Sequence, residues 1–144
     1  MSSNAHHIPE GFHSVTPYLT VQGADRLIDF MKDVFGAEEV IRSVRPEGGI
    51  AHAAVRLGDS MIELSEFTGE WGPSPCALHV YVQDPDAAYS RALEAGAVSL
   101  YAPADHEYGE RSGGVRDHAG NNWYIAKHLG SPALQESGSR ESAG

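Results

Sequence analysis

The feature that most constrains the fold is the stretch Ala51–Glu66, AHAAVRLGDSMIELSE, in which apolar and polar residues alternate around Gly58-Asp59. Alternation on both sides of a two-residue turn predicts a β-hairpin of two antiparallel strands. If Leu57 pairs with Ser60, every other pair across the hairpin follows. A register shift of one residue would exchange the two faces, so the pattern specifies the pairing.

This pairing gives the hairpin two chemically different faces. The apolar face carries Ala53, Val55, Leu57, Ile62 and Leu64, and the polar face carries His52, Arg56, Glu63 and Ser65. We expect helices to cover the apolar face and either a cavity or solvent to border the polar face. His52 and Glu63 should be near neighbours across the hairpin.

Length and charge exclude several classes of protein. A chain of 144 residues predicts one domain, or two small modules that share a core. The net charge of −10 argues against nucleic acid and against an anionic membrane as partners. Cys76 is the only cysteine, no apolar stretch could span a membrane, and the N-terminus does not resemble a signal peptide. We therefore expect a cytoplasmic protein.

The first half of the chain predicts the element order β-α-β-β-β. A strand is expected over 14–21, with Pro17 restricting it to an edge or a bulge. A helix over 24–35 follows, and Gly36 is a typical residue for ending it. Another strand over 38–44 leads into the hairpin.

The second half repeats this order. Ala77–Val82 alternates Leu78, Val80 and Val82 against Ala77, His79 and Tyr81. A helix should begin after Asp84 as the N-cap, with Pro85 in the first position. Its inner stripe is predicted to be Ala88, Tyr89, Ala92 and Leu93. Three strands are expected near 98–101, 114–116 and 122–127, with a long loop over 105–113.

The two halves form an internal repeat. TVQGADRLIDFMKDVFGAEEV and YVQDPDAAYSRALEAGAVSL share the strand, the helix and the Gly-Ala exit. With one helix for four strands, neither half covers its own sheet, so two must pack together or pair across a dimer. We predict a domain over 11–128, built from modules 11–67 and 76–128, between disordered segments 1–10 and 129–144.

Three stretches carry a resemblance to a known family: IAHAAVRLGDSMIELSE, ALHVYVQDPDAAYSRALEAGA and PADHEYGERSGGVRDHAGNNWYIAKH. With the paired βαβββ modules, they resemble the vicinal oxygen chelate superfamily of glyoxalase I, extradiol dioxygenases and bleomycin-resistance proteins, and within it the PhnB-like branch. The resemblance implies an α+β fold with a curved sheet and helices on its outer face. It also implies a homodimer and a small-molecule ligand.

In metal-bearing members of that superfamily, four strand positions supply the ligands. They fall here on Thr16, Glu63, Ala77 and Tyr124, of which only Glu63 is a usual metal ligand. We therefore expect no metal cofactor. The alternative is a divalent metal at a shifted site of His52, Glu63 and His79; otherwise the two histidines are hydrogen-bonded to Glu63, Tyr81 or water.

Further candidate ligand-binding residues are Thr16, Tyr18, His52, Arg56, Tyr81, Tyr108, Arg111 and Tyr124. Tyr18, Tyr81 and Tyr124 lie on the polar faces of their predicted strands, where they could stack on a ligand. Tyr108 and Arg111 fall in the predicted loop, which is long enough to form a lid. Arg111 would either clamp an anion or form a surface ion pair.

Two functions remain open. The first is a metal-independent protein of the bleomycin-resistance type that binds a small organic ligand between its modules. The second is an enzyme, a metal-dependent lyase, isomerase or dioxygenase. In a metal-free variant, Glu63 would act as the base and His79 or a tyrosine as the electrophile.

Overall fold

The structure is a computed structural model that describes residues 7–70 and 72–130. The chain divides into two compact units, Met1–Cys76 and Ala77–Gly144, and each is described by itself. Most of the two segments predicted to be disordered, 1–10 and 129–144, lies outside the described residues.

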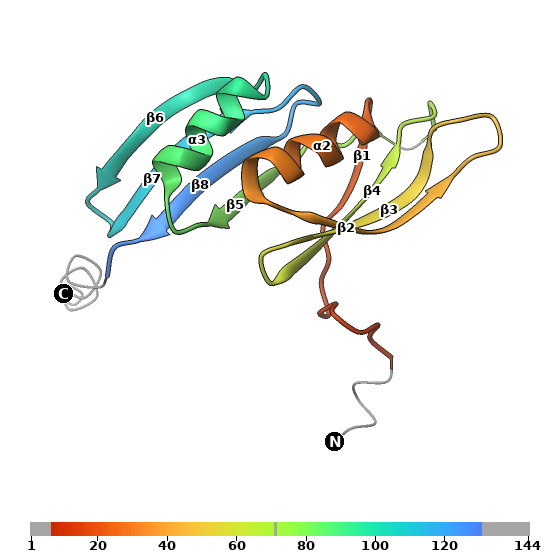
Figure 1. The fold of residues 1–144 in the computed structure, drawn as a ribbon, viewed down its shortest axis with the longest axis horizontal. Coiled ribbons are helices and arrows are strands. Elements are labelled where there is room, and N and C mark those ends of the chain that lie inside the picture. Colours follow the sequence, from red (N-terminus) through yellow and green to blue (C-terminus); the bar gives the residue numbers. More distant parts are fainter. Residues whose placement is uncertain (1–6, 71, 131–144) are drawn as a thin grey trace. The chain divides into compact units, whose positions relative to one another are not determined.

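The first unit is a four-stranded sheet with one helix. Its elements are β1 (Tyr18–Val21), α2 (Ala24–Phe35), β2 (Glu38–Val44), β3 (Ile50–Leu57) and β4 (Ser60–Glu66). The strand order is β1-β4-β3-β2, with β1 parallel to β4 and the other pairs antiparallel. Figure 1 shows α2 lying along one face of this sheet.

The hairpin has the predicted register. Leu57 pairs with Ser60, Arg56 with Met61, and Ala54 with Glu63. Alternate side chains of a strand point to opposite faces, so this register sends the apolar set toward α2. Ala53, Val55, Ile62 and Leu64 are all buried. The prediction from alternation is confirmed.

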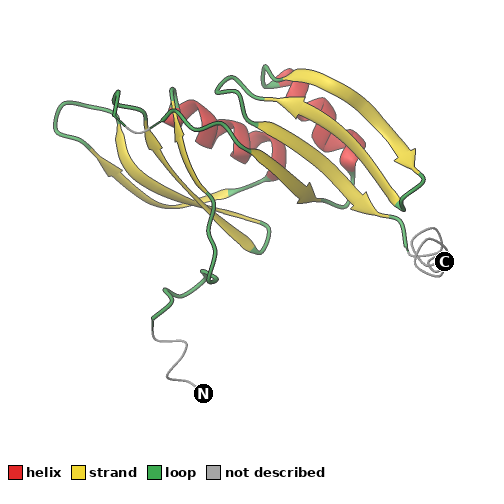
Figure 2. Cartoon of the chain, turned by 180° about the vertical axis from the view of Figure 1, so that it is seen from behind, coloured by secondary structure: helices red, strands yellow, loops and turns green. Residues whose placement is uncertain are grey.

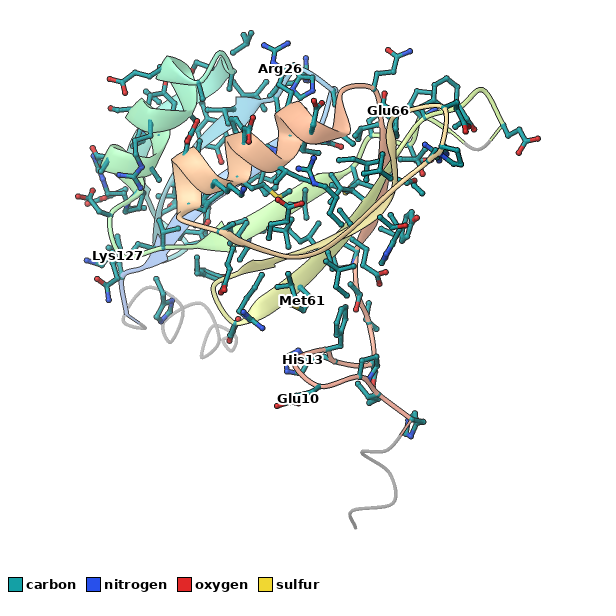
Figure 3. The ribbon with its side chains drawn as sticks, turned by 45° about the vertical axis from the view of Figure 1, so that its right-hand side comes forward. Glu10, His13, Arg26, Met61, Glu66 and Lys127 are labelled. Carbon is teal, nitrogen blue, oxygen red and sulfur yellow. The ribbon has the colours of Figure 1, made fainter. Side chains whose placement is uncertain are left out.

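Helix α2 also has the predicted bounds. It ends at Gly36, whose left-handed φ of 68° lets its backbone N–H bond to Lys32. The N-cap residue, Gly23, has no side chain that could accept a hydrogen bond from the first turn. The carboxylate of Glu66 in β4 supplies the cap instead, and Figure 3 labels this residue beside the first turn of the helix.

The first strand is shorter than predicted. We expected it over 14–21, but β1 begins at Tyr18. Pro17 has no N–H to donate to the ladder, so it contributes only its carbonyl, which accepts the N–H of Glu63 at 2.9 Å. The expected edge position of this strand is confirmed by the strand order.

The second unit repeats the first. Its elements are β5 (Ala77–Tyr81), α3 (Pro85–Glu94), β6 (Val98–His106), β7 (Glu110–Arg116) and β8 (Asn122–His128). The strand order β5-β8-β7-β6 matches that of the first unit, with the same parallel and antiparallel pairs. The prediction of two βαβββ modules in an α+β fold is confirmed.

The predicted long loop over 105–113 is wrong. Strand β6 continues to His106 and β7 begins at Glu110, so only a short turn joins them. Gly109 enables this turn with a φ of 92° and donates its N–H to the carbonyl of His106. Arg111 pairs with Asp105 within the ladder. This segment is therefore part of the sheet and does not form a lid.

Helix α3 begins as predicted, since Asp84 accepts the N–H of Ala87 and Pro85 follows it. Its inner stripe is narrower than predicted. Ala88 and Ala92 are buried, but Leu93 is 38% exposed. Tyr89 is half-buried and its hydroxyl lies 2.6 Å from that of Ser99. The buried residues of the helix are Pro85, Ala88 and Ala92.

The second sheet has one face on α3 and one face away from it. Val115, Trp123 and Ile125 face the helix and are fully buried. The opposite side, which we call the far face, is turned toward the viewer in Figure 2, with α3 behind the strands. Within residues 7–70 and 72–130, neither helix has the length and apolarity needed to cross a bilayer.

Candidate functional site

The far face of the first sheet, opposite α2, brings together three predicted site residues. Tyr18 pairs in register with Glu63, and the ring of Tyr18 stacks on His52 at 6.1 Å with a 20° interplanar angle. Nε2 of His52 lies 2.6 Å from Oε1 of Glu63. The expected contact between these last two residues is confirmed.

This face is less polar than the hairpin pattern predicted. Met61 lies on the same face of β4 as Glu63 but is only 4% exposed, and Ala54 and Ser65 on this face are also buried. Arg56 forms an ion pair with Glu38, its register partner on β2, at 2.9 Å. The Tyr18–His52–Glu63 cluster and the Arg56–Glu38 ion pair both remain partly accessible.

Thr16 lies just before β1 and is half-buried. Tyr81 lies on the edge strand of the second sheet, is 62% exposed, and meets the ring of His79 edge-on at 4.7 Å. Both positions are compatible with ligand contact, which stays a prediction.

The far face of the second sheet carries a continuous row of four rings. Tyr124 stacks on Tyr101 at 6.4 Å, and Tyr101 meets His106 edge-on at 5.9 Å. His106 then stacks on Tyr108 at 5.2 Å with an interplanar angle of 10°. Of these four residues, Tyr108 and Tyr124 are predicted site residues. We call Tyr124, Tyr101, His106 and Tyr108 the ring row.

Gly114 explains why Tyr101 lies flat on the sheet. Tyr101 and Gly114 are register partners, and a Cβ at position 114 would come within 2.6 Å of the Tyr101 ring. Only glycine leaves this space, so the ring covers the backbone of β7. The hydroxyl of Tyr101 lies 3.1 Å from that of the buried Ser112, which holds the ring in place.

His79 pairs with a carboxylate that sequence reasoning missed. Its Nε2 lies 3.0 Å from Oε2 of Glu110, whose side chain is only 12% exposed, whereas that of His79 is 42% exposed. Glu110 falls within the loop predicted over 105–113. Glu107-Tyr108-Gly109 between two alternating segments is a hairpin signal that could have placed it on a strand.

The two imidazole–carboxylate pairs specify hydrogen-bonding roles. A ring nitrogen that faces a carboxylate carries the proton, because the carboxylate can only accept. Nε2 of His52 and Nε2 of His79 are therefore the donors in these pairs. In the neutral imidazole, Nδ1 is then an acceptor. Each unit thus presents aromatic rings beside hydrogen-bond acceptors.

Arg111 forms the surface ion pairs that were one of its two predicted roles. It donates to both carboxylate oxygens of Asp86 on α3, at 2.7 and 2.8 Å, and to Asp105 at 2.9 Å. Its hydrogen bonds lower the pKa of Asp86 below the usual value for an aspartate. The guanidinium lies on the α3 side of the sheet and joins the helix to β6 and β7.

The metal-ligand positions implied by the superfamily do not fit a divalent ion. Ala77 has no donor atom, and Tyr124 is a phenol that accepts from Asn122. Thr16 contributes only a hydroxyl, so Glu63 is the single strong ligand. Within residues 7–70 and 72–130, no three His, Cys, Asp or Glu side chains come together in a way that could hold a metal ion. His79 contacts Glu110 of its own unit.

Comparison with known proteins agrees with this architecture. Residues 11–125 match the family model described as the Glyoxalase/Bleomycin resistance protein/Dioxygenase superfamily. An uncharacterized protein of Mycobacterium tuberculosis, Rv0887c, is 32% identical over 125 residues, which cover 79% of this chain and 74% of that protein.

Two solved structures are also similar. TioX from Micromonospora sp. ML1 is 28% identical, with a TM-score of 0.69 over 81% of this chain and 99% of that one. The fosfomycin resistance protein FosX from Mesorhizobium loti is 17% identical, with a TM-score of 0.60 over 87% and 97% of the two chains, and this likeness concerns the fold alone. From its repeated modules and from the match over residues 11–125, this chain belongs to the Glyoxalase/Bleomycin resistance protein/Dioxygenase superfamily.

Proposed function

We propose that this chain, as a member of the PhnB-like branch, binds a small organic ligand on the far faces of its sheets without a metal ion. The observation that carries the proposal is the ring row of the second sheet. Tyr108 is 50% exposed, and Tyr101, His106 and Tyr124 are half-buried. Rings that contact one another and stay accessible provide a preformed apolar platform with polar edges, which suits a small organic molecule.

The side chains at the four superfamily ligand positions support the proposal that ligand binding needs no metal ion. One strong ligand among the four superfamily positions is too few to hold a divalent ion, and that ligand, Glu63, is already bound to His52 at 2.6 Å. Ligand binding should therefore survive a chelator.

The His52–Glu63 contact favours a second candidate function, a metal-free isomerase or lyase. Glu63 would take a proton from a carbon next to a carbonyl. In an isomerase the proton would return at another carbon, and in a lyase the electron pair would expel a leaving group from the neighbouring carbon. Both side chains are partly exposed, at 36% and 26%. Exchange of such protons for deuterium in small ketones, abolished by Glu63→Gln, would identify this activity.

Two further features belong to the proposal. Each described sheet has a helix on one face only, so a homodimer would bury more of the far faces. A cytoplasmic location fits a chain whose only cysteine, Cys76, cannot form an intrachain disulfide. Sedimentation at micromolar concentration tests the dimer, and a monomer would contradict it.

The central experiment measures binding of small bicyclic aromatic compounds and of their saturated counterparts by saturation-transfer NMR, with and without EDTA. We expect the aromatic compounds to bind in both conditions. Tyr124→Leu should weaken binding because it removes one ring of the platform, whereas Tyr89→Leu, on helix α3, should not. Binding that requires added metal, or that is unaffected by Tyr124→Leu, would contradict the proposal.

A further inference from the structure

We infer that the far face of the second sheet selects flat aromatic ligands that carry a protonated amine. The aromatic part would lie on the ring row, and the ammonium group would bind at the His79–Glu110 pair. This inference rests on the proposed function and adds the chemical class of the ligand.

The ring row favours a flat and positively charged partner. The face of a tyrosine ring carries negative electrostatic potential, so it attracts both the edges of other rings and cations. Gly114 lets Tyr101 lie against the sheet, with Tyr124 stacked beside it at 6.4 Å. Together the two rings form a contiguous aromatic surface, which a planar aromatic ligand can contact over more of its area than a branched aliphatic one.

The His79–Glu110 pair presents only acceptors to a ligand when the imidazole is neutral. Nε2 of His79 is used in the contact with Glu110, which leaves Nδ1 as an acceptor. A carboxylate has about four lone-pair sites, and His79 occupies one of those on Glu110. The Glu110 side chain is 12% exposed, so few water molecules solvate its remaining lone pairs, and a donor that reaches it through this exposed edge, beside the 42% exposed His79, would be favourable. A ligand that binds here must therefore donate hydrogen bonds.

The cations of β7 are placed so that they do not compensate Glu110. Arg111 points to the opposite face of the sheet from Glu110, where it forms ion pairs with Asp86 and Asp105. Arg116 shares the parity of Glu110 but lies six residues along the strand, about 20 Å away, where it donates to Asn122. Neither arginine of β7 therefore pairs with Glu110, and the net charge of −10 adds a long-range attraction for cations.

Other titratable groups around Glu110 are imidazoles. His106 and His128 are its register partners on the two neighbouring strands. A protonated imidazole would repel an ammonium group. The test is therefore made at about pH 8, above the usual pKa of histidine.

Four matched probes separate ring from charge: 2-naphthylmethylamine, 2-naphthylmethanol, 2-naphthoate and cyclohexylmethylamine. Dissociation constants are measured by calorimetry on the full chain. We expect the naphthylmethylamine to bind about tenfold more tightly than the alcohol, because the ammonium group forms an ion pair with Glu110 in addition to its hydrogen bonds, whereas the alcohol carries no charge. The naphthoate should bind more weakly than the alcohol, and the cyclohexyl amine more weakly than the naphthyl amine.

Glu110→Gln should remove the advantage of the amine over the alcohol, because the amide keeps a carbonyl oxygen that accepts from either probe but has no charge to pair with the ammonium group. Glu94→Gln, which removes an exposed carboxylate from α3, is the matched control and should keep the advantage. If Glu110→Gln does not fold, the ranking of the four probes on the unaltered chain still decides the matter.

The outcomes distinguish this inference from the proposed function. If the alcohol or the naphthoate binds as tightly as the amine, or if Glu110→Gln keeps the amine advantage, the ligand class is wrong while small-molecule binding stands. If none of the three naphthyl probes binds, this inference and the aromatic platform both fail.

Discussion

The carboxylate of Glu110 lies 3.0 Å from Nε2 of His79, although β8 runs between their two strands. Both side chains point to the far face, His79 from β5 and Glu110 from β7, and they meet there. This contact predicts that the neutral imidazole of His79 is held as the Nε2–H tautomer. A long-range proton–nitrogen NMR spectrum should show that tautomer, and Glu110→Ala should convert it to a mixture. An Nδ1–H tautomer in the unaltered chain would contradict the assignment.

Gly114→Ala should lower the free energy of unfolding by about 1–3 kcal/mol, because the new methyl group would meet the Tyr101 ring at 2.6 Å. Urea denaturation measures the change. In a Tyr101→Ala background the same substitution should cost less, because the obstructing ring is absent. An equal cost in both backgrounds would show that the ring does not lie over Gly114.

Glu66→Ala should destabilise the first unit by about 1–2 kcal/mol. The Glu66 carboxylate accepts the N–H groups of Gly23 and Ala24 at 2.9 and 2.8 Å, and Gly23 has no side chain that could replace it. Hydrogen exchange of the first turn of α2 should become faster. Glu47→Ala, in the exposed turn before β3, is the control and should leave both quantities unchanged.

Asp117→Ala should be more damaging, at about 2–4 kcal/mol. This buried carboxylate accepts from the N–H groups of Ala119 and Asn121 and from Nε1 of Trp123, the last at 2.7 Å. Removing it leaves several buried donors without their acceptor. Denaturation measures the loss. Asp59→Ala, in the exposed turn of the β3–β4 hairpin, should cost little, and an equal cost for both would contradict this role.

Asp86 predicts a pH-dependent contribution to stability. Its pKa is lowered in the folded state by hydrogen bonds from Arg111, so the pair stabilises the fold above the usual pKa of an aspartate. That contribution is lost as the pH falls through the lowered pKa and Asp86 becomes protonated. Asp86→Asn should therefore reduce stability at neutral pH and have no effect in strong acid. A difference from the unaltered chain that persists in strong acid would contradict the prediction.

The local pattern of the sequence was sufficient for most of the fold. Alternation in Ala51–Glu66 predicted the observed register, and the Gly36 stop and the Asp84 cap predicted helix ends correctly. These features depend on contacts between residues close in the chain. The loop predicted over 105–113 was wrong: this polar segment lacks the apolar alternation that marks a strand, but in the structure β6 continues to His106 and a tight turn at Gly109 leads into β7.

The site followed the sequence only in part. The parity of the hairpin placed His52 beside Glu63, since both lie on neighbouring strands with a known register. The same reasoning placed Tyr18, His79 and Tyr124 on far faces. It could not find the partner of His79, because Glu110 lies 31 positions away on a strand that is not its neighbour.

The sequence by itself therefore determined the two βαβββ modules and, for the strands it predicted, the face on which a residue lies, because both follow from periodicity along the chain. Only the tertiary structure decided which side chains of a face touch. The contact of Tyr101 with Tyr124 and that of His79 with Glu110 depend on the order and curvature of strands distant in sequence. The space over Gly114 exists only once β6 and β7 are paired.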